Sequence, residues 1–183
     1  MFVMEVEDDL ALALVEPKFA PLYLEIVVRE RDYLSQWLAW PELAHDEAFF
    51  LAFIQRSLQG YAEGKSMTCA MVWQDNVVGN ISFNTINTRL KKVEIGYWLS
   101  AKYQGNGIVT KSVAKLIEIA FLELAMEKVE ISAAVENGAS RGVAERLGFA
   151  HEGTITRSEN LNGRIIDHAI YGLSRTAWRV NRD

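Results

Sequence analysis

The residues whose types and spacing best suit chemistry lie in one short stretch, Gln104 to Thr110, which reads Gln-Gly-Asn-Gly-Ile-Val-Thr. It joins a strand expected over 91–99 to an amphipathic helix expected from Val109 onward. The unpaired amides and the dipole of a helix start both favour an anion. Glycines let the backbone approach that anion where a Cβ would stand in the way. The stretch therefore indicates a site for a pyrophosphate or a similar group, although a tight turn without a ligand would explain the same two glycines.

Two familiar nucleotide motifs do not match this stretch. The Walker A motif ends in Gly-Lys-Ser/Thr, and this chain has Ile108, Val109, Thr110 and Lys111 instead. The dinucleotide fingerprint needs a third glycine where Thr110 stands, and it opens an early βαβ unit rather than following three strands. ATP bound on a Walker loop and NAD bound on a dinucleotide fingerprint are therefore not expected.

Covalent and metal chemistry have no matching pattern either. The chain lacks the Gly-x-Ser-x-Gly elbow of a serine nucleophile. Cys69 lies in an apolar run and is interpreted as a core residue. His45, His151 and His168 are scattered without the spacing of metal ligands. We expect neither a covalent intermediate nor a metal.

Composition places the chain among ordinary globular proteins. It has 183 residues, 23% of them charged, and no linker or repeat, so residues 1–183 are predicted to form one domain. A net charge of −5 argues against nonspecific nucleic-acid binding. No apolar run approaches the length of a membrane span, and the acidic N-terminus does not resemble a secretory signal. One cysteine excludes an internal disulfide and favours a reducing compartment, so the cytoplasm is the expected location.

Apolar periodicity predicts the elements that position these residues. Strands are expected over 10–14, 67–73, 77–84, 91–99, 129–135, 149–156 and 164–174. Helices are expected over 20–29, 46–61 and 109–124, with a short fourth helix that Asn137 caps and Gly148 ends. Three consecutive strands suggest an antiparallel meander, and Asn162-Gly163 a terminal hairpin turn. The order predicts an α/β or α+β fold with a mixed sheet.

Four separated motifs resemble one known family, the GNAT superfamily of N-acetyltransferases. Gln104, Gly107 and Val109 follow its acyl-CoA signature Gln/Arg-x-x-Gly-x-Gly/Ala, with valine at the last position where glycine or alanine is usual. The segment 134–149 is a more specific match. Together with 37–40 and 94–98, it resembles the ribosomal-protein-serine/alanine N-acetyltransferase branch, over nearly the whole chain.

The resemblance implies a fold and a co-substrate. The fold is a mixed, largely antiparallel sheet of about seven strands flanked by helices and splayed at the acetyl-CoA site. Acetyl-CoA is the acetyl donor, and no metal is required. The residues that the resemblance assigns to its binding are Gln104, Gly105, Asn106, Gly107, Ile108, Val109, Thr110 and Asn137.

It also implies direct transfer to a primary amine, which needs a base for the amine and an acid for the leaving thiolate. Ser140 is the expected acid, and a role in capping its helix is the alternative. Glu159 is the expected base, acting through water; the alternative, which is equally open, is a surface loop carboxylate without a catalytic role. Glu94 is the rival base.

Trp37 and Trp40 are expected to line the acceptor cleft or, equally, to plug the core. By resemblance the acceptor is the N-terminal α-amino group of a ribosomal protein, and a homodimer is a further expectation. Two alternatives stay open: an acetyltransferase for a small amine such as a polyamine or an antibiotic, and a non-catalytic acyl-CoA-binding module. Neither nucleic acid nor membrane is an expected partner.

Overall fold

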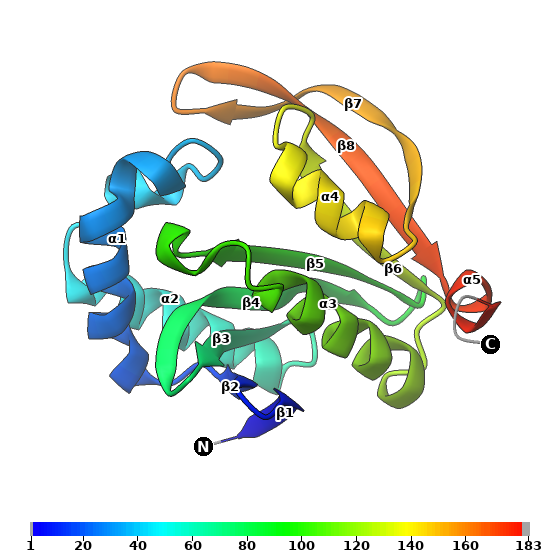
Figure 1. Ribbon diagram of the computed structural model, residues 1–183, viewed down its shortest axis with the longest axis horizontal. Helices are drawn as coiled ribbons and strands as arrows, with labels where there is room; N and C mark the ends of the chain where they lie inside the picture. Colours follow the sequence, from blue (N-terminus) through cyan, green and yellow to red (C-terminus); the bar gives the residue numbers. More distant parts are fainter. Residues whose placement is uncertain (1, 181–183) are drawn as a thin grey trace.

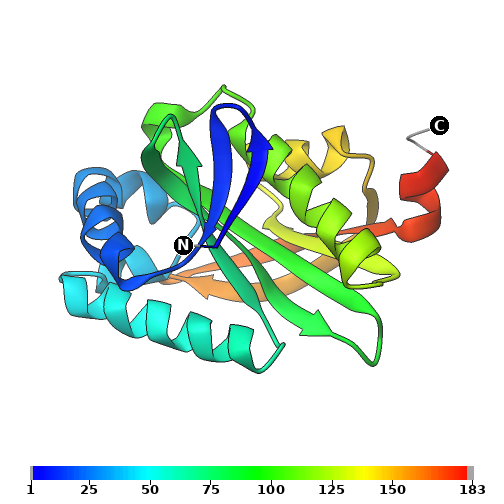
Figure 2. The same cartoon turned by 90° about the horizontal axis from the view of Figure 1, so that it is seen from below.

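One mixed sheet forms the centre of the protein and helices cover both of its faces (Figures 1 and 2). The computed structural model describes residues 2–180 of the chain. Within that range the sheet has eight strands in the order β1-β2-β3-β4-β5-β6-β8-β7. Helices α1 and α2 lie on one side of it, and α3 and α4 on the other.

The strands are β1 (Val3–Glu7), β2 (Leu10–Leu14), β3 (Met67–Trp73), β4 (Asn76–Asn87), β5 (Lys92–Leu99), β6 (Lys128–Ala134), β7 (Ala150–Leu161) and β8 (Arg164–Ser174). The α-helices are α1 (Ala20–Leu34), α2 (Glu47–Ala62), α3 (Ile108–Glu118), α4 (Gly138–Arg146) and α5 (Arg175–Val180). Three short 3-10 turns are η1 (Pro17–Phe19), η2 (Trp40–Leu43) and η3 (Ala101–Tyr103), and a π turn, η4 (Ile119–Glu123), continues α3.

The predicted mixed, largely antiparallel sheet is confirmed, with one strand more than expected. The additional strand, β1, forms an edge hairpin with β2. Glu5 and Glu7 hide it in the sequence, because glutamate is a poor strand former. Among the α-helices and strands of the described range, α5 is the other unpredicted element, and its six residues are too few to show a helical period.

The sheet splits at its middle, where β5 and β6 run parallel. Their pairing extends from Lys92 opposite Lys128 to Ile95 opposite Ile131 and stops there. Beyond this point β5 continues to Leu99 and pairs with β4 alone, whereas β6 turns away and pairs with β8. The facing backbone groups of the two strands are thus left without each other as partners, and a gap opens between them.

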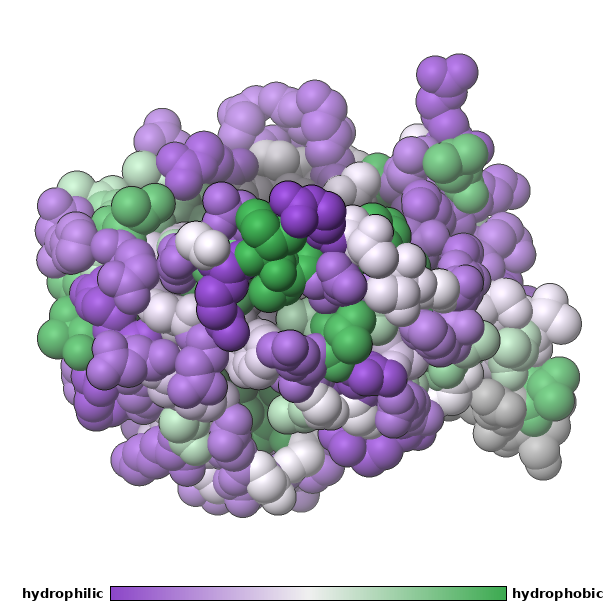
Figure 3. Space-filling view, turned by 90° about the horizontal axis from the view of Figure 1, so that it is seen from above, coloured by the Kyte–Doolittle hydropathy of each residue, from purple (hydrophilic) through white to green (hydrophobic). Residues whose placement is uncertain are grey.

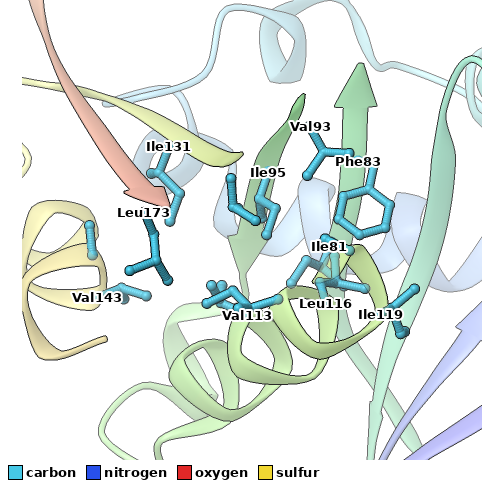
Figure 4. Packing of buried hydrophobic residues seen from close by; sticks show 14 of the residues in the cluster. Ile81, Phe83, Val93, Ile95, Val113, Leu116, Ile119, Ile131, Val143 and Leu173 are labelled. Atoms are coloured by element: carbon cyan, nitrogen blue, oxygen red, sulfur yellow. The ribbon is translucent and has the colours of Figure 1, made fainter. Parts of the chain in front are cut away.

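Two apolar cores lie on the two faces. Helix α3 presents Val113 and Leu116, each fully buried, to Ile81 and Ile95 of the central strands (Figure 4). Burial of such a side chain stabilises the fold by about 1.5–3 kcal/mol. The opposite face is covered by α1 and α2, whose core includes Tyr23, Phe50 and Ile54. The two cores together hold β5 and β6 in place on either side of the gap.

Within residues 2–180, no helix combines the length and the apolar character needed to cross a membrane.

Candidate active site

A cavity of about 1200 Å³ occupies the gap between β5 and β6 and reaches both faces of the sheet. Gly107 and Ser140 line it on the side of α3 and α4. Trp37, Phe53 and Glu159 line it on the side of α1, α2 and the β7–β8 hairpin. Two ligands could therefore enter from opposite faces and meet between the strands.

The first half of the cavity is built around the start of α3. Gly107 precedes the helix with a φ of 73°, in the left-handed region that favours glycine. The first N–H groups of α3, from Ile108 to Thr110, have no acceptor within the helix. No heavy atom lies within 4 Å of the place where a Cβ of Gly105 would be. This open loop of unpaired amides fits a pyrophosphate.

Seven of the eight residues predicted to bind acetyl-CoA line the cavity; they are Gln104, Gly105, Gly107, Ile108, Val109, Thr110 and Asn137. The eighth, Asn106, instead donates hydrogen bonds from its side-chain amide to the carbonyls of Tyr103 and Gln104, at 3.0 and 3.2 Å. It holds the turn in shape. Val109, the unusual residue of the signature, also packs against the core on the α3 side.

Two residues that the sequence did not single out complete this half. Arg146 lines the cavity and donates from Nη2 to Thr110 Oγ1 at 3.2 Å, so a cation lies beside the helix start. Tyr33 of α1 accepts a hydrogen bond from the Gln104 side chain, and burial raises the pKa of Tyr33. The glycine loop is therefore tied to the helices on both of its sides.

Ser140 lies on the wall where the two halves meet. The predicted cap is confirmed: Asn137 Oδ1 accepts from the Ser140 backbone N–H at 3.1 Å. The Ser140 hydroxyl is therefore not the cap, and it forms a 3.0 Å hydrogen bond with the hydroxyl of Tyr97 on β5. Burial raises the pKa of Tyr97, so this phenol is protonated at neutral pH. Tyr97 also lines the cavity, and no pattern in the sequence indicated it.

Glu159 projects into the cavity from β7, next to a histidine. Its Oε2 lies 3.0 Å from Nε2 of His168 on β8. Nδ1 of His168 lies 2.9 Å from the hydroxyl of Ser132 on β6. All three side chains line the cavity. Spacing along the chain gave no sign of His168 or Ser132 as site residues.

A bulge in β7 aims Glu159. Ile155 pairs with His168 and Glu159 with Ile166, so residues 156–158 of β7 face Asp167 alone. Asp167 Oδ1 accepts the backbone N–H of Arg157 at 2.7 Å and closes the bulge. Such bulges redirect side chains beside active sites.

Glu94, the rival base, does not line the cavity. It lies on β5 two residues before Gly96, and its carboxylate is 3.5 Å from the Asn84 amide. Glu94 therefore reaches the cavity only through Asn84, which lines it, whereas Glu159 lines the cavity directly.

The half of the cavity on the side of α1, α2 and the β7–β8 hairpin has an aromatic wall and a polar floor. Trp37 and Trp40 both line it, as predicted for a cleft. Trp40 also packs against Phe49, Phe50 and Trp98, with ring centroids 5.7–6.3 Å apart. Trp40 therefore lines the cavity and is also part of the hydrophobic core. The floor consists of small polar side chains from β3, β4 and β6: Thr68, Asn80, Ser82, Asn84 and Ser132.

The β7–β8 hairpin covers this half of the cavity and contacts the segment that follows α1. It runs toward the segment after α1 (Figure 1), where Arg164 donates to the Gln36 carbonyl at 2.6 Å and lies over the Trp37 ring. Figure 3 looks onto this side and shows apolar patches among hydrophilic residues. Ile155 and Ile165 of the two strands are about half exposed.

Comparison with known proteins gives consistent results. The Acetyltransferase (GNAT) domain family matches residues 10–150. The Bacillus subtilis protein YdaF is 32% identical over 97% of this chain and 98% of its own. The ribosomal-protein-serine acetyltransferase of Escherichia coli is 31% identical, over 92% of this chain and 94% of its own. The structure of the ribosomal L7/L12 α-N-protein acetyltransferase RimL with coenzyme A superimposes with a TM-score of 0.92 at 27% identity, covering 96% of this chain and 99% of that one.

Proposed function

Since this chain belongs to the GNAT family and is an acetyl-CoA-dependent N-acetyltransferase, we propose that its acceptor is the N-terminal α-amino group of a ribosomal protein. One observation carries the proposal: the cavity joins a phosphate-binding loop on one face to a polar-floored cleft with a carboxylate on the other. Relatives that match nearly the full length of this chain bear the names of enzymes with this kind of substrate.

The charges of the cavity support a peptide over a polyamine. Among the described residues that line it, Glu159 is the one acidic side chain, against Arg56 and Arg146. A polyamine carries several positive charges and would need several carboxylates, whereas a peptide N-terminus brings a single ammonium group. The small polar residues of the floor suit the amide groups of a peptide backbone.

The roles of the residues follow from where they lie. Acetyl-CoA supplies the acetyl group as an activated thioester. The first turn of α3 and Arg146 hold its phosphates, and Glu159 takes a proton from the acceptor ammonium through water. The amine then attacks the thioester carbon and forms the C–N bond, and the C–S bond breaks as the nitrogen releases its second proton. Ser140, hydrogen-bonded to Tyr97, donates its proton to the departing sulfur and regains one from the proton that the nitrogen releases, so that CoA leaves as the thiol.

We also propose that residues 1–183 form a single domain. All eight strands of the described range join one sheet, and both helical layers pack on it.

The acceptor is tested with synthetic peptides that carry the N-terminal sequences of ribosomal proteins. Each is incubated with enzyme and acetyl-CoA beside a matched peptide whose α-amino group is blocked and whose lysines are free. We expect mass spectrometry to find one added acetyl group on the free peptide and none on the blocked one. Turnover of polyamines or other small amines, with every peptide unmodified, would refute the proposed acceptor.

A further inference from the structure

Three adjacent strands bring one polar side chain each to the acceptor end of the cavity. In the sheet order β6-β8-β7 these are Ser132, His168 and Glu159. The distances are 2.9 Å from Ser132 Oγ to His168 Nδ1 and 3.0 Å from His168 Nε2 to Glu159 Oε2. The side chains of His168 and Glu159 are 20% and 33% exposed, so both are mostly shielded from bulk water.

For an ionised Glu159 beside a neutral His168 ring, each hydrogen bond of this row has one possible direction. An ionised carboxylate only accepts, so Nε2 of His168 must carry a hydrogen. In the neutral ring Nδ1 then has a free lone pair and accepts from the Ser132 hydroxyl. The order of donation runs from Ser132 through His168 to Glu159, and it selects one tautomer of the imidazole.

Other charged groups nearby are engaged elsewhere. Asp167 accepts from the backbone of Arg157 within the bulge. Arg164 reaches across to the Gln36 carbonyl. Within the part of the chain that the structure describes, the Glu159 carboxylate has one hydrogen-bond partner, His168, which it meets through Oε2. Oε1 has no hydrogen-bond partner among residues 2–180, and Glu159 lines the cavity.

We propose that Ser132 and His168 are positioning residues for the base Glu159: they hold Oε2 and present Oε1 to the acceptor amine. This inference rests on the role of Glu159 in the proposed function. His168 moves no proton itself; it fixes the carboxylate in one orientation, and orientation of a catalytic group is a large part of its efficiency.

Two substitutions of His168 distinguish the contribution of Nε2 from that of Nδ1. In His168→Gln the amide nitrogen takes the place of Nε2 and keeps the donor to Glu159. In His168→Asn the shorter amide takes the place of Nδ1 and loses that donor. We expect kcat to fall by about ten- to a hundredfold in His168→Asn, the range typical of partners that orient a reactive group, and to recover in part in His168→Gln.

Controls come from the same chain. His151 is an exposed histidine of β7 outside the cavity, and His151→Asn should leave kcat unchanged. The KM for acetyl-CoA should be unchanged in all of these variants, because the glycine loop is not touched. In a Glu159→Gln background, His168→Asn should cause little further loss, because residues that act as one unit are not additive. Equal kcat in wild type and His168→Asn would overturn the inference.

A second measurement does not depend on the acceptor. Long-range ¹H–¹⁵N NMR correlations of the side chain distinguish the two neutral tautomers of histidine. We expect the Nε2–H form for His168 at neutral pH, and a change of its signals in Ser132→Ala and in Glu159→Gln. The Nδ1–H form would sink the inference even if ribosomal peptides are acetylated. Conversely, failure of all peptides as acceptors would refute the proposed function and leave this measurement valid.

Discussion

At the residue scale, Ser140 shows how the structure separates two readings of one hydroxyl group. The sequence was compatible with a helix cap and with a catalytic acid. The side chain of Asn137 caps helix α4, because it accepts a hydrogen bond from the backbone N–H of Ser140. The hydroxyl of Ser140 is left to Tyr97, on the cavity wall.

Replacement of Ser140 by alanine should therefore affect turnover and leave stability alone. We expect kcat to fall by about 10²- to 10⁴-fold, the usual contribution of a general acid, with a much smaller change in the KM for acetyl-CoA. Steady-state kinetics and thermal unfolding measure the two effects. Asn137→Ala is the matched comparison and should lose about 1 kcal/mol of stability as the cap is removed. Wild-type kcat in Ser140→Ala would exclude the acid role.

The sequence named Ser140 and Glu159, but not their partners. Tyr97 is 43 positions from Ser140, and Ser132 is 36 positions from His168. Local patterns carry no information about such pairs. The spacing of the histidines excludes a metal site but carries no information about another role for His168. Its sequence neighbours do carry a signal, because His168 is a polar residue between Ile166 and Ile170 on one face of β8.

At the element scale, the predicted ends of two strands fall at bulges. The strand expected to end at Asn84 continues as β4 to Asn87, and the one expected to end at Thr156 continues as β7 to Leu161. Register shifts occur at Asn84 and over residues 156–158. Alternation of side chains breaks at a bulge, so the periodic signal stops there although the strand goes on.

The same reason explains why the position of Glu159 could not be derived. The sequence placed it in a loop before the hairpin turn, whereas it lies within β7, paired with Ile166. Only the bulge brings its side chain to the cavity. Bulges depend on contacts such as that of Asp167 with the Arg157 backbone, which sequence periodicity does not reveal.

The start of α3 permits a prediction about the donor site. Gly107→Val places a branched side chain in the left-handed region and into the cavity, so we expect the KM for acetyl-CoA to rise by about tenfold or more, about 1.4 kcal/mol of binding. Gly64→Val is the matched control. Gly64 has a similar φ of 66° and open space around it, but it lies outside the cavity. Both variants should lose stability, and only Gly107→Val should lose affinity. An unchanged KM would remove the loop from the donor site.

At the scale of the whole molecule, the buried acids predict how stability depends on pH. Burial raises the pKa of the Cys69 thiol to about 12, from about 9. Burial also raises the pKa of Tyr23 above its usual value of 10.0. Above pH 9 the unfolded chain releases the thiol proton while the folded chain keeps it. The unfolded state then binds fewer protons, so stability is full below pH 9 and falls as pH rises toward 12.

The free energy of unfolding, measured with urea, should accordingly fall by about 1–2 kcal/mol between pH 8 and pH 10. Cys69→Ala removes one of the groups and should reduce this fall by about 1 kcal/mol, whatever its effect at pH 8. The comparison is between the two pH values within each protein, so the cavity left by the smaller side chain cancels. An equal fall in both proteins would show that the thiol does not contribute.

The opening between β5 and β6 also belongs to the whole molecule. It was expected only from the family resemblance, because no local pattern in either strand says where their pairing ends. Pairing stops after Ile95 and Ile131, although β5 continues to Leu99 and β6 to Ala134. What separates them is the packing of entire layers, α1 and α2 on one face and α3 and α4 on the other.

A cavity open to both faces fixes the kinetic order of the reaction. Donor and acceptor can be bound together, and the one cysteine is 1% exposed in the core, so no thiol is placed to carry the acetyl group. We expect sequential kinetics, with double-reciprocal lines that intersect when both substrates are varied. Enzyme mixed with acetyl-CoA alone should keep its mass in intact-protein mass spectrometry. Parallel lines together with an acetylated enzyme would instead require a covalent intermediate, and the two halves of the cavity would then have to act in turn.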